Sequence, residues 1–173
     1  MGCKSLQVRV YMTKGDWNNA LAVAEDIINN APYSLWNTSE YASAWSEGSA
    51  SHAKEILFEL VIDDTTDWTD REGIAYLYSG VAGVGYGDVV VTKAFSDMLT
   101  SDPQDVRNNI LLEPLDPESV YAGNKVYINK MPAVAGDPRY ADVPVLRLSE
   151  VYLSAAEAAF QAGDLNKTAM LAE

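Results

Sequence analysis

Cysteine and histidine are almost missing from this chain of 173 residues, in which Cys3 and His52 are the sole examples of their types. A single cysteine excludes an internal disulfide and a cysteine-rich zinc site. A single histidine leaves little material for histidine-bound metals or for Ser-His-Asp catalysis. We therefore expect no metal site, no cofactor and no enzymatic activity.

Basic residues and long apolar runs are also scarce. The chain has 12 Lys and Arg against 25 Asp and Glu, a net charge of -13. A field of this sign repels phosphate groups, which argues against nucleic-acid partners and against adsorption to anionic membranes. No run of apolar residues approaches the roughly 20 that a transmembrane helix requires. Neutral and cationic ligands remain compatible with this composition.

The chain has an apolar pattern of helical period near its start. A helix over residues 4–13, with Leu6, Val10 and Tyr11 facing inward, is expected to end at Gly15, because glycine readily adopts a left-handed conformation. Asp16 follows as the N-cap of a second helix that runs to residue 31. The apolar face of this second helix consists of Trp17, Ala20, Leu21, Ala24, Ile27 and Ile28.

A similar helix and Gly-Asp turn recur near the end. We expect a helix that begins near Val145, then a turn at Gly163-Asp164, then the start of a further helix. Its apolar stripe consists of Leu148, Val151, Tyr152, Ala155 and Ala159. Both segments are typical of tetratricopeptide-like helical hairpins. We therefore predict a mainly α fold forming one domain over residues 1–173, with hairpins at 4–31 and 144–173, the second truncated, and a loop-rich insert at 32–143.

The insert contains a few short regular elements between long loops. Its patterns predict short helices at 40–45 and 92–99, a strand at 54–62 and a further strand at 125–129. The stretch from 63 to 88 resists regular assignment, and a long irregular segment inside a compact domain is often functional.

Other functional patterns in the insert are incomplete. The acidic cluster that begins at Asp63 departs from the calcium-loop pattern, since Trp68 occupies the glycine position, so either an irregular calcium site or a solvated loop remains. The glycine run 80–87 lacks the Lys-Ser/Thr of a phosphate-binding loop. Glycoside hydrolysis requires two acids that face one cleft. Glu55 and Glu59 would share a strand face, but any alternating strand produces that arrangement.

Aromatic residues in the irregular stretch provide the remaining candidate site. Rings stack on the apolar faces of sugars, and neighbouring charged groups bond their hydroxyls. The candidate ligand-binding residues are Trp68, Tyr76, Tyr78, Tyr86, Asp70 and Arg71. Alternatively, the same rings fix the loop to the scaffold.

Several segments, in this order, resemble the SusD/RagB family. They are Arg9-Val10-Tyr11 through Gly15-Asp16-Trp17, then Glu55-Ile56-Leu57-Phe58-Glu59, then Asp102 to Arg107, then Pro144 to Leu153 with Ala156-Glu157-Ala158. The family offers no fixed sugar-contacting motif to transfer, so the candidate residues above depend on the loop argument alone. Within these segments, Arg147, Glu150 and Glu157 are expected to form structural ion pairs.

The resemblance implies a bacterial outer-membrane protein on the extracellular face. Such a protein binds a glycan or another nutrient and delivers it to a SusC-like TonB-dependent porin, anchored by a lipid that this chain lacks. The resemblance covers the whole chain as a central to C-terminal fragment of such a protein. The alternative function is a protein-interaction scaffold that binds peptide through its tetratricopeptide-like hairpins.

Overall fold

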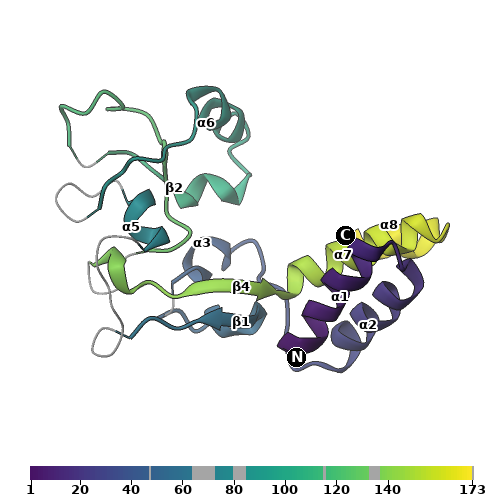
Figure 1. The fold of residues 1–173 in the computed structure, drawn as a ribbon. Helices are drawn as coiled ribbons and strands as arrows, with labels where there is room; N and C mark the ends of the chain where they lie inside the picture. Colours follow the sequence, from purple (N-terminus) through teal and green to yellow (C-terminus); the bar gives the residue numbers. More distant parts are fainter. Residues whose placement is uncertain (47, 64–72, 80–84, 115, 133–136, 173) are drawn as a thin grey trace. The chain divides into compact units, whose positions relative to one another are not determined.

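The computed structural model is mainly α-helical with a few short strands, as the sequence predicts (Figure 1). It describes residues 1–46, 48–63, 73–79, 85–114, 116–132 and 137–172. The chain divides into two compact units. The helical unit comprises Met1–Leu35, Ala53–Glu59 and Pro144–Glu173, and the loop-rich unit comprises Trp36–His52 and Leu60–Val143.

The first hairpin forms as its sequence predicts. Helix α1 (Gly2–Lys14) ends at Gly15, whose φ of 69° lies in the left-handed region and whose N–H donates to the Met12 carbonyl. Asp16 then caps helix α2 (Trp17–Asn30), and its Oδ1 accepts a hydrogen bond from the Asn19 N–H at 3.4 Å. This turn reverses the chain so that α2 packs along α1.

The second hairpin uses the same turn chemistry. Helix α7 (Leu148–Gln161) is followed by Gly163, with φ of 85°, and by helix α8 (Leu165–Ala172). Asp164 Oδ1 accepts a hydrogen bond from the Lys167 N–H at 3.0 Å, which caps α8. The repeated Gly-Asp turn therefore has one structural role at both ends of the chain.

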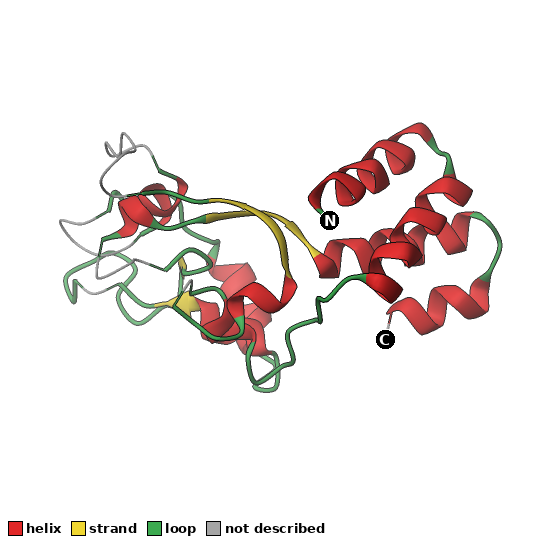
Figure 2. Cartoon of the chain, turned by 90° about the horizontal axis from the view of Figure 1, so that it is seen from below, coloured by secondary structure: helices red, strands yellow, loops and turns green. Residues whose placement is uncertain are grey.

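The prediction that a helix begins near Val145 was wrong. Residues Val143–Arg147 form strand β4, which pairs with strand β1 (Ile56–Leu60) in a two-stranded sheet visible in Figure 2. Pro144 lacks a backbone donor and disfavours a helical residue before it, and the flanking valines favour extended backbone. Leu146 of β4 is fully buried, so pairing with a strand distant in sequence decides the conformation here.

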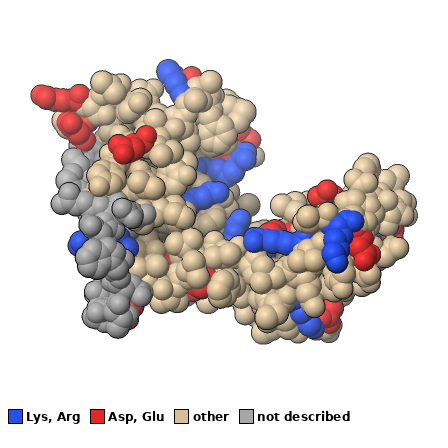
Figure 3. Space-filling model, in the orientation of Figure 1, with Lys and Arg blue, Asp and Glu red and all other residues tan. Residues whose placement is uncertain are grey.

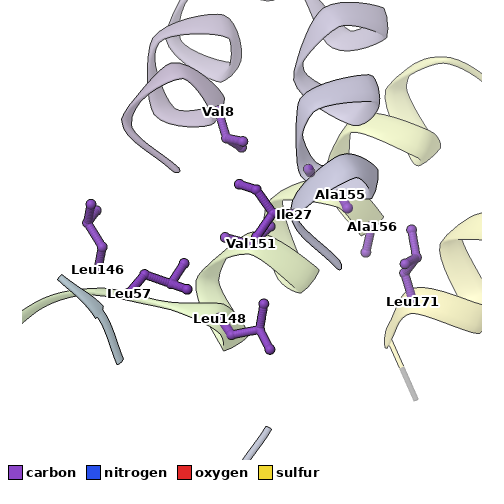
Figure 4. Packing of buried hydrophobic residues seen from close by; sticks show 10 residues of the cluster. Val8, Ile27, Leu57, Leu146, Leu148, Val151, Ala155, Ala156 and Leu171 are labelled. Atoms are coloured by element: carbon purple, nitrogen blue, oxygen red, sulfur yellow. The ribbon is translucent and has the colours of Figure 1, made fainter. Parts of the chain in front are cut away.

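The core of the helical unit lies where α2, α7 and the strands meet. Helix α2 packs against α7 through small side chains, and Ala24 and Ala155 are both fully buried. Alanines at a helix contact allow the two backbones to approach closely. Figure 4 shows this cluster, which consists of Val8, Ala24, Ile27, Leu57, Leu146, Leu148, Val151, Ala155, Ala156 and Leu171.

The inward face predicted for α1 was wrong in part. Leu6 and Val10 are 49% and 52% exposed, whereas Ser5 and Val8 are 2% exposed, and Tyr11 is half-buried. Apolar residues occur on more than one side of α1, so its periodicity does not select a face. The small Ser5 side chain lets this face of the helix pack closely, and the tertiary partners choose it.

Ion pairs join segments of the helical unit that are far apart in the sequence. Arg9 donates to both carboxylate oxygens of Glu150 and, at 2.8 Å, to the Val145 carbonyl. Arg147 Nη1 lies 3.2 Å from Glu55 Oε1. The ion pairs expected for Arg147 and Glu150 are thus confirmed, whereas Glu157 is exposed. On the face shown in Figure 3, acidic and basic side chains lie next to one another over this unit.

The loop-rich unit contains short elements. They are α3 (Tyr41–Ala44), α5 (Ile74–Tyr78), α6 (Lys93–Thr100), η1 (Val106–Ile110), β2 (Leu111–Leu112), β3 (Tyr127–Ile128) and η2 (Pro138–Tyr140), with the helical turn α4 (His52–Glu55) at the unit boundary. These positions agree with the predicted helices at 40–45 and 92–99, and both predicted strands are present in shortened form. Strands β2 and β3 pair antiparallel with Leu111 opposite Ile128. Among the described residues, no helix has the length and apolar character to cross a membrane.

Candidate functional site

Helix α5 places tyrosine rings on two sides of one short turn. Gly73 precedes the helix in an extended conformation, and its carbonyl accepts the Leu77 N–H. Tyr76 is 8% exposed, whereas Tyr78 is half-buried. The helix contacts η2, so Tyr76 faces the interior and Tyr78 remains accessible at the surface.

At Gly85, near the end of the glycine run, the backbone passes very close to Ser79, the residue that follows α5. A Cβ atom at Gly85 would lie 2.5 Å from Ser79 Cβ and 2.7 Å from the Ser79 carbonyl oxygen, so this position requires glycine. The next residue, Tyr86, donates its N–H to the Tyr76 carbonyl at 3.0 Å. The two tyrosine rings meet edge to face, 4.9 Å between centroids at 83°. Tyr86 thereby covers Tyr76 and remains 50% exposed itself.

Tyr78 lines a small surface pocket of about 160 Å³. The other described residues of its wall are Ile128 from β3, and Lys130 and Met131 from the loop after that strand. The pocket combines a tyrosine with aliphatic side chains and a lysine. Such a combination is suited to a sugar, which has apolar C–H faces and a polar periphery.

Lys130 connects this pocket to an aromatic cluster. Its Nζ lies 5.1 Å from the centroid of the Trp45 ring, a cation–π contact. Trp45 is 6% exposed and packs edge to face against Trp36 at 5.2 Å and Tyr41 at 6.0 Å. The buried His52 ring nitrogen Nδ1 lies 2.8 Å from the Ala44 carbonyl oxygen. This cluster is structural packing that supports the pocket wall.

A charged pair borders α5 on its inner side. Arg139 on η2 donates to both carboxylate oxygens of Asp137, with Nη2–Oδ2 at 2.5 Å. These hydrogen bonds hold the pKa of Asp137 below its usual value. The same guanidinium lies 5.2 Å from the Tyr140 ring centroid. The pair fixes the η2 turn against which α5 packs.

The structure brings part of the predicted set of site residues together. Tyr76 and Tyr86 form one ring pair, and Tyr78 lies on the same helix as Tyr76 and lines the pocket. The remaining predicted members, Trp68, Asp70 and Arg71, lie outside the described residues, as do most of the acidic cluster and the glycines at 80 and 83. Of the three described tyrosines in the predicted set, Tyr78 and Tyr86 are accessible enough to contact a ligand, whereas Tyr76 is buried.

Sequence reasoning did not identify Ile128, Lys130, Met131 or Trp45. Isolated aliphatic and lysine residues have no motif that distinguishes a pocket wall from ordinary surface. One signal was present, because the predicted strand at 125–129 places Lys130 and Met131 directly at a strand end, where loops often form binding sites.

The candidate carboxylate pair for glycoside hydrolysis is divided between two elements. Glu55 is 3% exposed and bonds Arg147, so it is part of the helical unit's ion pairs. It belongs to α4, whereas Glu59 is on β1, so the two do not share a strand face. Across the described ranges, no group of three or more His, Cys, Asp or Glu side chains is arranged to hold a metal ion.

Comparison with solved structures shows what this chain is similar to. A SusD superfamily protein from Bacteroides thetaiotaomicron VPI-5482 superposes with a TM-score of 0.84 at 31% identity, over 97% of this chain and 38% of that protein. A candidate sugar-binding protein from Bacteroides vulgatus ATCC 8482 superposes with a TM-score of 0.79 at 41% identity, over 98% of this chain and 36% of that protein. A laminarin-binding SusD-like protein shares the fold at 21% identity and a TM-score of 0.60, over 90% of this chain and 42% of that protein.

No protein-family model and no curated protein sequence matches the chain. The chain spans somewhat more than a third of the length of the first two structural relatives. The superpositions nevertheless cover nearly all of this chain's own length. On this likeness, the chain belongs to the SusD/RagB family.

Proposed function

We propose that this chain binds a glycan through its loop-rich unit, at the pocket lined by Tyr78, with the exposed Tyr86 of the same unit as a second aromatic contact. The observation on which the proposal depends is the pocket of about 160 Å³ lined by Tyr78. A half-buried ring beside aliphatic side chains offers a sugar a stacking face together with a partly dry wall. The sugar-binding description of the Bacteroides vulgatus relative supports the same ligand class.

The binding is proposed to leave the glycan intact. Retaining and inverting glycosidases use two carboxyl groups that flank one bond, and the described wall of the pocket consists of Tyr78, Ile128, Lys130 and Met131. Chromatography of an oligosaccharide after long incubation with the chain is expected to recover it unchanged. Release of shorter sugars would contradict this part of the proposal.

The experiment for binding is isothermal titration calorimetry against a panel of neutral and acidic oligosaccharides. We expect at least one to bind the chain, and Tyr78→Ala to weaken it by about tenfold, since stacking of this kind contributes on the order of 1 kcal/mol or more. Tyr78→Phe keeps the ring and is expected to retain most of the affinity. The matched control is Tyr121→Ala, which removes a 38% exposed tyrosine outside the described pocket wall. Failure of every sugar to bind would contradict the proposal.

We further propose that the bound glycan is passed to a SusC-like TonB-dependent porin at the extracellular face of the outer membrane. Membership of the SusD/RagB family supports this place in uptake. Co-purification from native outer membranes is expected to recover a porin of that type with the protein that contains this chain. Recovery in the periplasmic fraction without a porin would contradict this step.

A second candidate function, protein binding by the helical hairpins, is supported by apolar side chains on the surface of the helical unit. Leu153 and Phe160, separated by two helical turns on α7, are 65% and 57% exposed. The variant Leu153→Gln/Phe160→Gln separates the two functions. Glycan binding by the loop-rich unit predicts normal sugar affinity for this variant, whereas a function in the hairpins predicts that the variant loses its protein ligand.

A further inference from the structure

The pocket beside Tyr78 has room for a single ring. Its volume of about 160 Å³ lies below the roughly 300–1,000 Å³ that is typical of sites for drug-sized ligands. A cavity of roughly 150 Å³ lined by aliphatic and aromatic side chains holds one benzene molecule, which is also a six-membered ring. The pocket therefore suits one pyranose unit at the end of a glycan, and the rest of the glycan remains outside it.

The wall of this pocket is mostly apolar. Ile128 and Met131 contribute aliphatic side chains, and Tyr78 contributes an aromatic ring. The fourth described wall residue is Lys130, whose ammonium lies 5.1 Å from the centroid of the Trp45 ring. Trp45 is 6% exposed and is not among the described residues of the wall. This contact of the ammonium lies outside the pocket, and apolar groups dominate the wall itself.

An apolar wall discriminates between the substituents of a sugar ring. With the C–H face of the ring on Tyr78, substituents at one edge of the ring meet the aliphatic side chains of Ile128 and Met131. A hydroxyl placed there loses its hydrogen bonds to water and gains none from aliphatic groups, which is unfavourable. A methyl group placed there is removed from water, which is favourable. The wall therefore favours a ring that carries a methyl group on this edge.

We propose that this pocket selects a terminal 6-deoxyhexose, a sugar in which a methyl group replaces the exocyclic hydroxymethyl group. The methyl group lies against Ile128 and Met131, and the ring hydroxyls face the open side of the pocket, where water satisfies them. The inference rests on the proposed glycan-binding function and names its ligand class. A neutral sugar also suits a chain with a net charge of -13, because it carries no charge for that field to repel.

The test uses pairs of sugars that differ only at carbon 6. Methyl α-L-fucopyranoside is paired with methyl α-L-galactopyranoside, and methyl α-L-rhamnopyranoside with methyl α-L-mannopyranoside. Titrations of the chain followed by ligand-observed nuclear magnetic resonance measure the affinity of each sugar. We expect at least one 6-deoxy sugar to bind about tenfold more tightly than its hydroxylated partner. In saturation-transfer spectra, its methyl protons are expected to receive more saturation than its ring protons.

Met131→Gln tests the wall directly, because it replaces an aliphatic side chain with a polar one of similar length. It is expected to reduce the preference for the 6-deoxy sugar to about twofold or less. Met98→Gln is the matched control, since it makes the same change at a 58% exposed methionine on α6, outside the described wall. This control is expected to keep the full preference.

The outcomes separate this inference from the glycan-binding proposal. Equal affinities within each pair, or tighter binding of the hydroxylated member, overturn the 6-deoxyhexose inference and leave glycan binding intact. Binding of other oligosaccharides when neither pair binds has the same meaning, as does an unchanged preference in Met131→Gln. If no sugar of any kind binds, the proposed function fails as well. The comparison within each pair needs no variant, so it decides the matter even if Met131→Gln does not fold.

Discussion

Arg147 and Glu55 form an ion pair in which the carboxylate is almost completely buried. Arg147 Nη1 lies 3.2 Å from Glu55 Oε1, and the side chains are 29% and 4% exposed. Arg147 ends β4 and Glu55 immediately precedes β1, so the pair joins the two strands of one sheet at the edge of the helical core. A buried carboxylate is costly unless it is paired, which makes this contact a condition for the local packing.

Removal of the arginine alone is therefore expected to destabilise the helical unit. Arg147→Met leaves the Glu55 carboxylate buried without this donor, and we expect a loss of about 2–4 kcal/mol in the free energy of unfolding. The double variant Arg147→Met/Glu55→Met removes both charges and is expected to be more stable than the single variant. Urea titrations followed by far-ultraviolet circular dichroism measure both. A double variant less stable than Arg147→Met would contradict a stabilising role confined to this pair.

Gly85 is expected to tolerate no side chain. A Cβ there would meet Ser79 Cβ at 2.5 Å and the Ser79 carbonyl oxygen at 2.7 Å, and the second of these is backbone and cannot rotate away. Gly85→Ala should separate the loop from α5, at a cost of about 1–3 kcal/mol. Faster hydrogen exchange of the Tyr86 N–H, which bonds the Tyr76 carbonyl, reports the separation directly.

Gly48→Ala is the control for that substitution, because the nearest atom to a Cβ there is the Ser46 Oγ at 4.0 Å. We expect it to change the free energy of unfolding by less than about 0.5 kcal/mol. Unchanged exchange at Tyr86 in Gly85→Ala would show that the close approach has no structural consequence.

The Asp137–Arg139 pair makes the loop-rich unit sensitive to acid. Its hydrogen bonds lower the pKa of Asp137 in the folded chain below the unfolded value of about 3.9. The stabilisation is therefore fully present above about pH 5 and is lost as the pH falls through the folded pKa. The difference in stability between the chain and Asp137→Asn is expected to shrink steadily from pH 5 to pH 2. The difference in stability between the chain and Arg139→Gln should shrink over the same pH range. A difference that does not change with pH would contradict this assignment.

The parts of the fold predictable from sequence are those that local chemistry decides. The Gly15-Asp16 and Gly163-Asp164 turns each combine a left-handed glycine with a capping carboxylate, and both form as predicted. The face of α2 also follows its spacing, because Ala20, Ala24 and Ile27 are all buried.

Predictions failed where distant partners decide the structure. Val145 lies in a strand because β1, far away in the sequence, pairs with β4. Leu6 and Val10 are exposed because the tertiary partners of α1 contact the side that carries Val8. The pocket follows the same rule, since Tyr78 and Lys130 meet only through tertiary packing. Aromatic content pointed to Tyr78, whereas the local signal for the lysine was its position after the predicted strand at 125–129.

Replacement of Trp45 tests what the buried aromatic cluster contributes to the stability of the loop-rich unit. Trp45→Leu fills part of the buried site but removes the aromatic face that lies 5.1 Å from the Lys130 ammonium. We expect a loss of about 2–4 kcal/mol in stability, since a large buried ring is replaced by a smaller side chain.

Trp45→Phe is the matched variant, because it keeps an aromatic face of smaller size under Lys130. It is expected to retain more of the stability of the unchanged chain than Trp45→Leu, because a ring can still meet Trp36 and Tyr41 edge to face. Urea titrations followed by circular dichroism measure both variants. Equal stability of the two variants would mean that the aromatic contacts contribute no more than aliphatic packing does.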